Sequence, residues 1–263
     1  AAMKFSRSGE VTHIGFFPFE VKGRTPFPGG YELLIANSHI KAQKMTNAKD
    51  TFNQRVASYE IGLLLLRERF PQLAPRLERL RDLQPKRLGV RPSELYRMLL
   101  TLPETLTRGQ VVELLGHRYG EFLATLFKSH AEPERYLIRS VVLYGAAECA
   151  RAELCRDFLA RGDMEGLGRL MQISHDGDRV VKYTAGDEGW TCRSYDYSAA
   201  DGYLESLIDD LRSEDPERVA KAQLHLQPGG YACSTPEIDE MVDLSLQVPG
   251  VLGAQLSGAG LGG

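Results

Sequence analysis

The chain has 263 residues, 43% of them hydrophobic and 25% charged, and a formal net charge of −3 at pH 7. This composition is ordinary for a globular protein, and the charge gives no general basis for binding nucleic acid. The longest apolar run, residues 61–66, is far too short to span a bilayer, so we predict that the chain has no membrane-spanning helix.

Residues 1–45 are predicted to form strands, which we interpret as the C-terminal part of an N-terminal sheet domain. The turn sequences Arg7-Ser8-Gly9 and Pro28-Gly29-Gly30 separate the apolar runs. The predicted strands cover residues 2–6, 11–21 and 31–40. The last of them begins at Tyr31 and is mostly apolar on both faces, as expected of an inner strand.

From residue 46 onward, apolar residues recur every three or four positions, which is typical of helices that pack on one face. The first helix is predicted to begin at a capping residue, Asn47, and to end at Pro71. Further helices are predicted within residues 76–131, where several are short, and over residues 134–160, 163–174 and 236–248. Strands followed by helices indicate the α+β class, with a helix-rich domain over residues 46–263.

Residues 176–232 differ from the rest of this helical domain. They contain Trp190, which is the only tryptophan, together with several tyrosines and a charged run at residues 213–218. We interpret them as an insertion or a lid with a helix of its own near residues 199–211. A specificity lid and a plain surface insertion both fit this pattern, and the sequence favours neither.

The last thirteen residues contain the most informative motif. A mostly apolar stretch, residues 251–256, leads into Ser257-Gly258-Ala259-Gly260-Leu261-Gly262-Gly263. We predict a strand that enters a glycine-rich loop. Glycines reach backbone angles that other residues avoid, and such a loop can direct several N–H groups at one anion, often a phosphate. An ordinary turn between two strands explains the glycines alone, but the preceding helix and strand favour a ligand-binding loop.

The order of these elements resembles the last motif of the GHMP small-molecule kinases, with galactokinases as the nearest branch. In that family a helix beginning Cys-Pro-Glu-Leu-Asp is followed by Val-Pro-Gly-Val and by Gly-Gly-Gly-Phe-Gly-Gly. Here the corresponding sequences are Ser234-Thr235-Pro236-Glu237-Ile238-Asp239, Val248-Pro249-Gly250-Val251 and the loop from Ser257. Ala259 replaces a glycine of the family motif, and Leu261 replaces an aromatic residue.

The resemblance extends upstream in separate blocks. Asn37-Ser38-His39-Ile40 resembles the family's Asn-Ser-Asn-Val strand end, Phe52-Asn53-Gln54-Arg55 resembles its Tyr-Asn-x-Arg element, and residues 161–175 resemble a helix pair. The family's N-terminal sugar motif, central nucleotide loop and acidic catalytic residue have no counterpart here. We therefore expect a fragment of a longer kinase that is inactive alone.

The resemblance implies an ATP- and Mg²⁺-dependent sugar 1-kinase, which phosphorylates the anomeric hydroxyl of galactose or a related hexose in the cytoplasm. It implies sugar-binding positions at Phe52, Asn37 and Ser38. It implies a nucleotide and phosphate loop made of Ser257, Gly258, Ala259, Gly260 and Gly262. No catalytic residue and no metal ligand are assigned, and the oligomeric state is open.

Two alternatives to a hexose kinase stay open. One is a galactokinase-like sensor or regulator that binds sugar and nucleotide without catalysis. The other is a kinase for another sugar or a sugar acid, because Phe52 lacks the hydroxyl of the family's tyrosine and the loss of one polar contact can change selectivity.

Several of these residues also have purely structural interpretations. Phe52 can be a core aromatic, and Asn37 with Ser38 can cap a strand end. His175 is followed by Asp176 but has no nucleophile beside it, so we predict a helix-end histidine. The acidic residues of the last helix, Asp239, Glu240 and Asp243, are predicted to be solvated. The cysteines are predicted to be reduced thiols outside any metal site, and they are Cys149, Cys155, Cys192 and Cys233.

Overall fold

The computed structural model describes residues 2–39, 45–186, 189–195, 199–258 and 260, with the backbone alone for residues 2, 3 and 45–48. The helices of this part are α1 (Ala2–Phe5), α2 (Met45–Arg69), α3 (Pro85–Leu88), α4 (Pro92–Leu100), α5 (Arg108–Leu126), α6 (Arg139–Arg161), α7 (Met164–Asp178), α8 (Asp201–Asp210), α9 (Pro216–Lys221) and α10 (Pro236–Ser245). Short 3₁₀ turns lie at Ala74–Arg76, Leu80–Asp82, Phe127–Ser129 and Leu224–Leu226.

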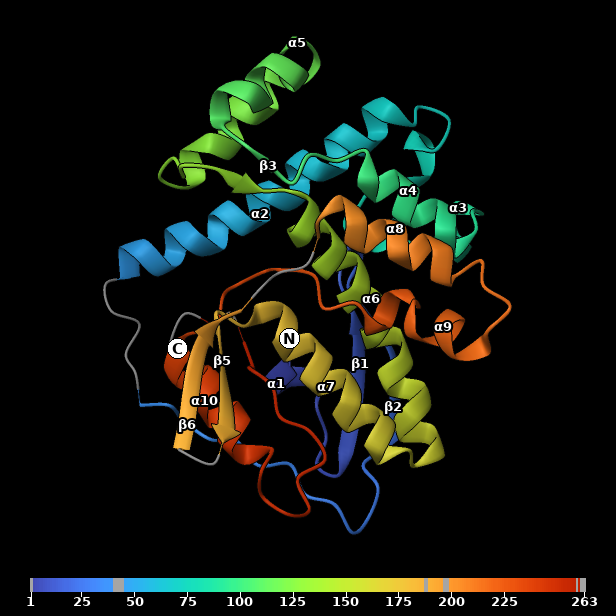
Figure 1. Cartoon of the computed structure of the whole chain (residues 1–263), viewed down its shortest axis with the longest axis vertical. Helices are drawn as coiled ribbons and strands as arrows, with labels where there is room; N and C mark the ends of the chain where they lie inside the picture. The colour runs from blue at the N-terminus through green and yellow to red at the C-terminus, as the bar shows by residue number, and fades with distance from the viewer. Residues whose placement is uncertain (1, 40–44, 187–188, 196–198, 259, 261–263) are drawn as a thin grey trace.

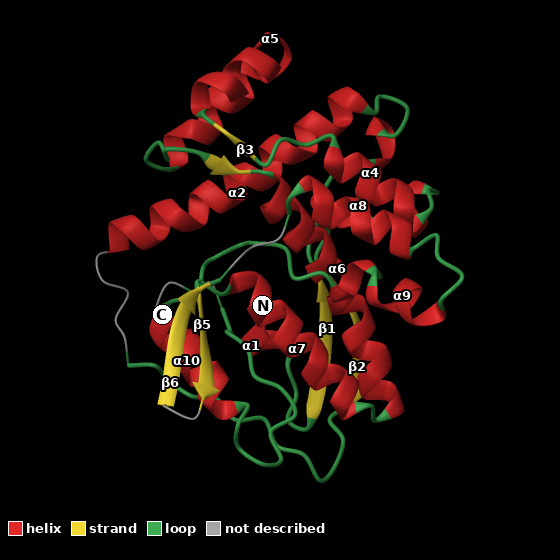
Figure 2. Ribbon diagram, in the orientation of Figure 1, coloured by secondary structure: helices red, strands yellow, loops and turns green. Residues whose placement is uncertain are grey.

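The strands of the described residues pair as antiparallel two-stranded sheets. These are β1 (Glu10–Gly15) with β2 (Glu20–Pro26), β3 (Thr105–Leu106) with β4 (Tyr136–Leu137), and β5 (Val181–Gly186) with β6 (Gly189–Ser194). Figure 1 shows α2, α3, α4, α5 and α8 in the upper part of the molecule, with α7, α10 and the two long hairpins below. Figure 2 shows that helices dominate and that the strands stand in separate pairs, in agreement with the α+β class.

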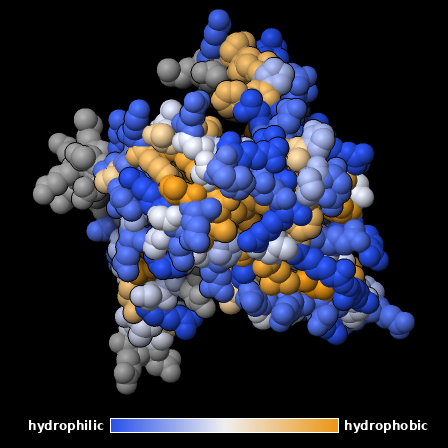
Figure 3. Space-filling model, turned by 90° about the horizontal axis from the view of Figure 1, so that it is seen from above, coloured by the Kyte–Doolittle hydropathy of each residue, from blue (hydrophilic) through white to orange (hydrophobic). Residues whose placement is uncertain are grey.

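The main hydrophobic core lies between α2, α4, α6 and α8. Leu66, Leu99, Val142 and Leu204, one from each helix, are completely buried in a single cluster. Burying one such side chain contributes about 1.5–3 kcal/mol, so these contacts decide how the four helices pack. The upper face of the molecule is mostly polar, with smaller apolar areas exposed between the charged residues (Figure 3).

The segment predicted as an insertion or lid is built into this core at its helical end. The helix predicted near residues 199–211 is confirmed as α8. Two buried arginines of α6 hold the segment through backbone carbonyls: Arg139 Nη1 donates to Ala199 O at 3.0 Å, and Arg151 Nη1 donates to Gln227 O at 2.9 Å. The other end, the β5–β6 hairpin, has an outer strand whose residues, including Trp190, are all exposed.

The predicted strands of residues 1–45 need correction. Residues 2–5 form the short helix α1, and the predicted strand over residues 11–21 is divided into β1 and β2 by the turn around Pro18. Proline has no N–H to donate to a sheet, so it interrupts the run. Residues 31–39 form no strand, and the side chains of Leu33, Leu34 and Ile35 are 69%, 82% and 91% exposed. No described strand lies beside this segment to pair with its backbone.

The helix predictions are closer to the structure, with some shifts at the ends. The first helix already includes Met45, so Asn47 is not its cap. The helix predicted from residue 134 begins at Arg139, because Tyr136 and Leu137 pair with β3. No described helix is both long and apolar enough to cross a membrane.

Residues 251–256, predicted as a strand, form no regular element either. They run along α7, and the two backbones approach so closely that a Cβ at Gly168 would lie 2.2 Å from Leu252 O. Gln172 Nε2 donates to Leu252 O at 3.1 Å, so this segment forms a hydrogen bond with a helix side chain instead of with a neighbouring strand.

Candidate functional site

The glycine-rich loop begins directly after residues 251–256, near the upper end of β5 (Figure 1). Ser257 and Gly258 are exposed, and the φ of Gly258 is +96° with open space where a Cβ would point. An L-residue is strained at this angle, so the loop needs glycine there. Ala259 and Gly262, which belong to the predicted loop, lie outside the described residues, as do Leu261 and Gly263.

The far side of the loop packs against the segment that precedes α10. A Cβ at Gly260 would lie 2.1 Å from Cys233 O, so the two backbones are in direct contact. Two residues later, Thr235 caps α10, with its Oγ1 accepting from the N–H of Ile238 at 3.4 Å. The described part of the loop therefore lies close to the N-terminus of α10.

Helix α2 holds the same segment from the opposite side. Arg55 Nε donates to Tyr231 O. The ring of Tyr231 stacks between Tyr59 and Tyr144, with ring centroids 5.6 Å and 5.0 Å away. The Cys233 thiol next to this stack is not a candidate nucleophile, because burial raises its pKa to about 12.

The predicted sugar-binding residues are only partly placed by the structure. The ring of Phe52 is 37% exposed, three residues before Arg55 on α2, so the two side chains share a face of that helix. Phe52 is therefore not a core aromatic. Asn37 is exposed, and its Oδ1 accepts from the N–H of His39 at 2.8 Å, which is a local turn contact. Ser38 is half-buried, and no hydrogen bond within the described residues joins Asn37 to the glycine loop.

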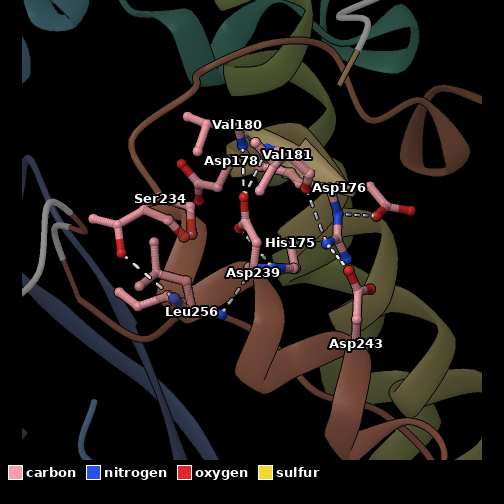
Figure 4. A network of polar contacts seen from close by, with 12 residues as sticks. His175, Asp176, Asp178, Val180, Val181, Ser234, Asp239, Asp243 and Leu256 are labelled. Atoms are coloured by element: carbon pink, nitrogen blue, oxygen red, sulfur yellow. Dashed lines mark hydrogen bonds and ion pairs between the residues drawn. The ribbon is translucent and has the colours of Figure 1, made fainter. Parts of the chain in front are cut away.

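Beneath the loop lies a buried polar network that connects α7, α10 and β5 (Figure 4). Asp239 Oδ2 accepts from the N–H groups of Val180 and Val181, both at 2.9 Å, and its Oδ1 lies 3.2 Å from His175 Nε2. Burial alone raises the pKa of Asp239. The contacts with His175 and Ser234 and the two backbone N–H groups outweigh burial and hold that pKa below its ordinary value.

One turn further along α10, Asp243 forms a second anchor. Its Oδ2 accepts from Arg179 Nη1 and from the N–H of Tyr183, both at 2.8 Å, and Lys182 Nζ lies 2.9 Å from Oδ1. The prediction of a solvated acidic face is therefore wrong for Asp239 and Asp243, which are 0% and 3% exposed. The prediction is confirmed for Glu240, which is exposed. Asp239 and Asp243 are buried because they accept from backbone N–H groups at and just before the start of β5.

Asp178 joins this network to the tyrosine stack. Its Oδ2 accepts from the Tyr144 hydroxyl at 2.7 Å, and its Oδ1 is buried without a hydrogen-bond partner. Burial is the largest cause that raises the pKa of Asp178, to about 6, and the Tyr144 hydrogen bond opposes it. This carboxylate therefore takes up a proton far more readily than an exposed one.

We expect Asp178→Asn to stabilise the protein by about 2 kcal/mol at pH 8 and to have little effect at pH 4. A raised folded-state pKa means that the folded protein binds the proton more tightly than the unfolded chain, so wild-type stability falls as the pH rises from about 4 to about 6. Urea unfolding at both pH values measures this. Asp209→Asn, the same substitution at an exposed position of α8, serves as the control, and a destabilised Asp178→Asn at pH 8 would contradict the assignment.

Sequence reasoning missed the network and the tyrosine stack. The available signal was the spacing of Gly168, Gln172 and His175, which lie on one face of α7 at intervals of four and three. In the part of the chain that the structure describes, no group of His, Cys, Asp and Glu side chains is arranged to hold a metal ion.

Comparison with known proteins gives one family match. Residues 207–263 match the family model described as GHMP kinases C terminal. The match begins within α8 and covers α9, α10 and the glycine-rich loop. No curated protein matches the chain significantly, and no solved structure does.

Proposed function

Because residues 207–263 make this chain a member of the GHMP kinase superfamily, we propose that it is part of an ATP-dependent sugar 1-kinase that phosphorylates the anomeric hydroxyl of a hexose. The family consists of phosphotransferases that are generally ATP-dependent. The sugar, the galactokinase-like branch, the need for Mg²⁺ and a cytoplasmic location belong to the proposal. The division of the chain near residue 45 is likewise a proposal.

The observation that carries this proposal is that the glycine-rich loop packs against the segment that precedes α10. Gly258 has a positive φ that favours glycine, and the contact of Gly260 with Cys233 holds this part of the loop beside the segment that precedes α10. Backbone N–H groups in such a loop suit phosphate oxygens. Phosphoryl transfer depends mainly on this kind of positioning and charge neutralisation, so a phosphate-holding loop is the part of the machinery that this segment would supply.

In the proposed kinase, Ser257, Gly258 and Gly260 lie beside the transferred phosphate, together with Ala259 and Gly262. Phe52 shares its helix face with Arg55, which contacts the segment next to the loop, and this supports a role for Phe52 near the sugar. Asn37 and Ser38 complete the proposed sugar contacts. Mg²⁺ would accompany the nucleotide through its phosphate oxygens.

ATP binding to the protein encoded by the complete gene tests the loop assignment, because the family's central nucleotide loop has no counterpart in these 263 residues. We expect calorimetry to show that Gly258→Val weakens ATP binding, measured with Mg²⁺ present, by about tenfold or more. The native loop has a φ of +96° at this position, which β-branched residues avoid, so valine forces the loop backbone into another conformation. Gly202→Val is the matched control, since Gly202 is an exposed position of α8 with nothing near its Cβ position. Equal affinity of Gly258→Val and the wild type would contradict the phosphate role of the loop.

A second assay separates the kinase from the alternative of a non-catalytic sensor that binds sugar and nucleotide. The protein encoded by the complete gene is incubated with ATP, Mg²⁺ and a panel of hexoses, pentoses and sugar acids, and phosphate transfer is measured. Transfer to hexoses supports the proposal. Sugar and nucleotide binding without transfer supports the sensor, and preference for another sugar replaces the hexose assignment.

A further inference from the structure

His175 occupies a place that connects α7, α10 and the entrance of the glycine-rich loop. Its side chain is completely buried in the last turn of α7. The N–H of Leu256, the residue immediately before the loop, donates to His175 Nδ1 at 3.3 Å. On the other side of the ring, Nε2 lies 3.2 Å from Asp239 Oδ1 (Figure 4).

These two contacts determine the state of the imidazole. Because Nδ1 accepts the Leu256 N–H, Nδ1 carries no proton, and the neutral ring carries its proton on Nε2. Nε2 lies 3.2 Å from Asp239 Oδ1, a charge contact without hydrogen-bond geometry, and the lowered pKa of Asp239 means that its carboxylate is ionised. The negative charge of Asp239 beside Nε2 therefore favours the tautomer of His175 that can accept from Leu256.

Helix α7 contacts the segment that enters the loop at three successive positions along one face. Gly168 contacts Leu252 through the backbone, Gln172 binds Leu252 O, and His175 binds the N–H of Leu256. The last contact is the nearest to the loop, and within the loop Gly260 is in contact with Cys233. The described residues of the loop thus lie between two contacts, one at Leu256 and one at Gly260, and the contact at Leu256 depends on one side chain.

The geometry points to His175 as a positioning residue for the start of the glycine-rich loop: as an Nε2-protonated imidazole beside Asp239, it fixes the Leu256 N–H and with it the direction in which the N–H groups of Ser257 and Gly258 face a phosphate. The part of this inference that concerns phosphate rests on the proposed function. His175 touches no reacting atom in this arrangement, so its effect is on nucleotide affinity through loop order.

Two substitutions of His175 test the contacts of its two ring nitrogens separately. In His175→Asn the side-chain oxygen replaces Nδ1, so Leu256 keeps an acceptor while the contact with Asp239 is lost. In His175→Gln the amide reaches the position of Nε2, so the contact with Asp239 is kept while Leu256 loses its acceptor. A residue that serves only for packing would not distinguish the variants in this order.

Amide hydrogen exchange of the 263-residue chain measures the loop directly. We expect exchange at Leu256, Ser257 and Gly258 to be about tenfold faster in His175→Gln than in the wild type, and to change less than about threefold in His175→Asn. His117→Gln, the same substitution at an exposed histidine of α5, is the control and leaves these amides unchanged. Equal exchange in the two His175 variants, or faster exchange in His175→Asn, overturns the inference.

ATP with Mg²⁺ is the probe for the second measurement, which uses the protein encoded by the complete gene. We expect the Kd to rise about tenfold in His175→Gln and less than about threefold in His175→Asn. If the wild type does not bind ATP, the proposed function fails, and the exchange pattern still decides the positioning role of His175. If the wild type binds ATP and loop exchange changes without any change in Kd, the phosphate part of the inference is overturned.

Discussion

Asp239→Ala is expected to lower the free energy of unfolding by about 3–5 kcal/mol, the range measured when one partner of a buried charged network is removed. The carboxylate of Asp239 is completely buried and is the acceptor for two consecutive backbone N–H groups at the start of β5. The substitution leaves these N–H groups without a partner in a region that water does not reach, and each unsatisfied group costs about 1–3 kcal/mol. Urea unfolding at pH 7 measures the loss.

The neighbouring residue provides the control for Asp239→Ala. Glu240 is exposed on the same helix, so Glu240→Ala is expected to change the free energy of unfolding by less than about 0.5 kcal/mol. Asp239→Asn keeps an oxygen for the two N–H groups and loses the charge beside His175, and we expect an intermediate loss. If Asp239→Ala and Glu240→Ala have equal effects, the carboxylate does not support β5 in the way that the structure indicates.

The helices are the part of this fold that the sequence predicts best. An apolar repeat of three or four residues is a local property, and it correctly indicates α2, α6, α7, α8 and α10. The strands are predicted less well because a strand needs a partner. Residues 31–35 have the apolar pattern of an inner strand, yet no described strand supplies hydrogen bonds to them. Residues 251–256 have the same pattern, and hydrogen-bond to side chains of α7 instead.

The candidate site also has one part that the sequence predicts and one part that it does not. The glycine-rich loop is visible in the sequence because glycine itself carries the signal. The groups that hold it are not, because Asp239 and Asp243 are four residues apart on α10 and have the spacing of an ordinary polar stripe. Only the placement of β5 against that stripe shows that both carboxylates are buried acceptors. His175 is likewise correctly predicted at a helix end, but its two contacts come from segments more than 60 residues away in the chain.

Gly168→Val is expected to lower the free energy of unfolding by about 3 kcal/mol. A Cβ at this position would lie 2.2 Å from Leu252 O and 2.5 Å from the carbonyl carbon of the same residue. Both are backbone atoms, so no side-chain rotation relieves the clash, and α7 must separate from the segment that enters the glycine-rich loop. The contact is reciprocal, since a Cβ at Gly253 would lie 2.4 Å from Gly168 O.

The separation caused by Gly168→Val has a local consequence that distinguishes it from a general loss of stability. Because Leu252 and Leu256 bind Gln172 and His175 on the same face of α7, moving this segment outward lengthens both hydrogen bonds. Amide exchange at Leu256 should therefore increase under native conditions as well as in the urea titration. Gly202→Val is the matched control, because its Cβ meets no atom within 4 Å and α8 should accept it with little change in stability. A Gly168→Val protein as stable as Gly202→Val would show that α7 and the loop segment are not in direct backbone contact, and the anchoring of the glycine-rich loop to α7 would have to be abandoned.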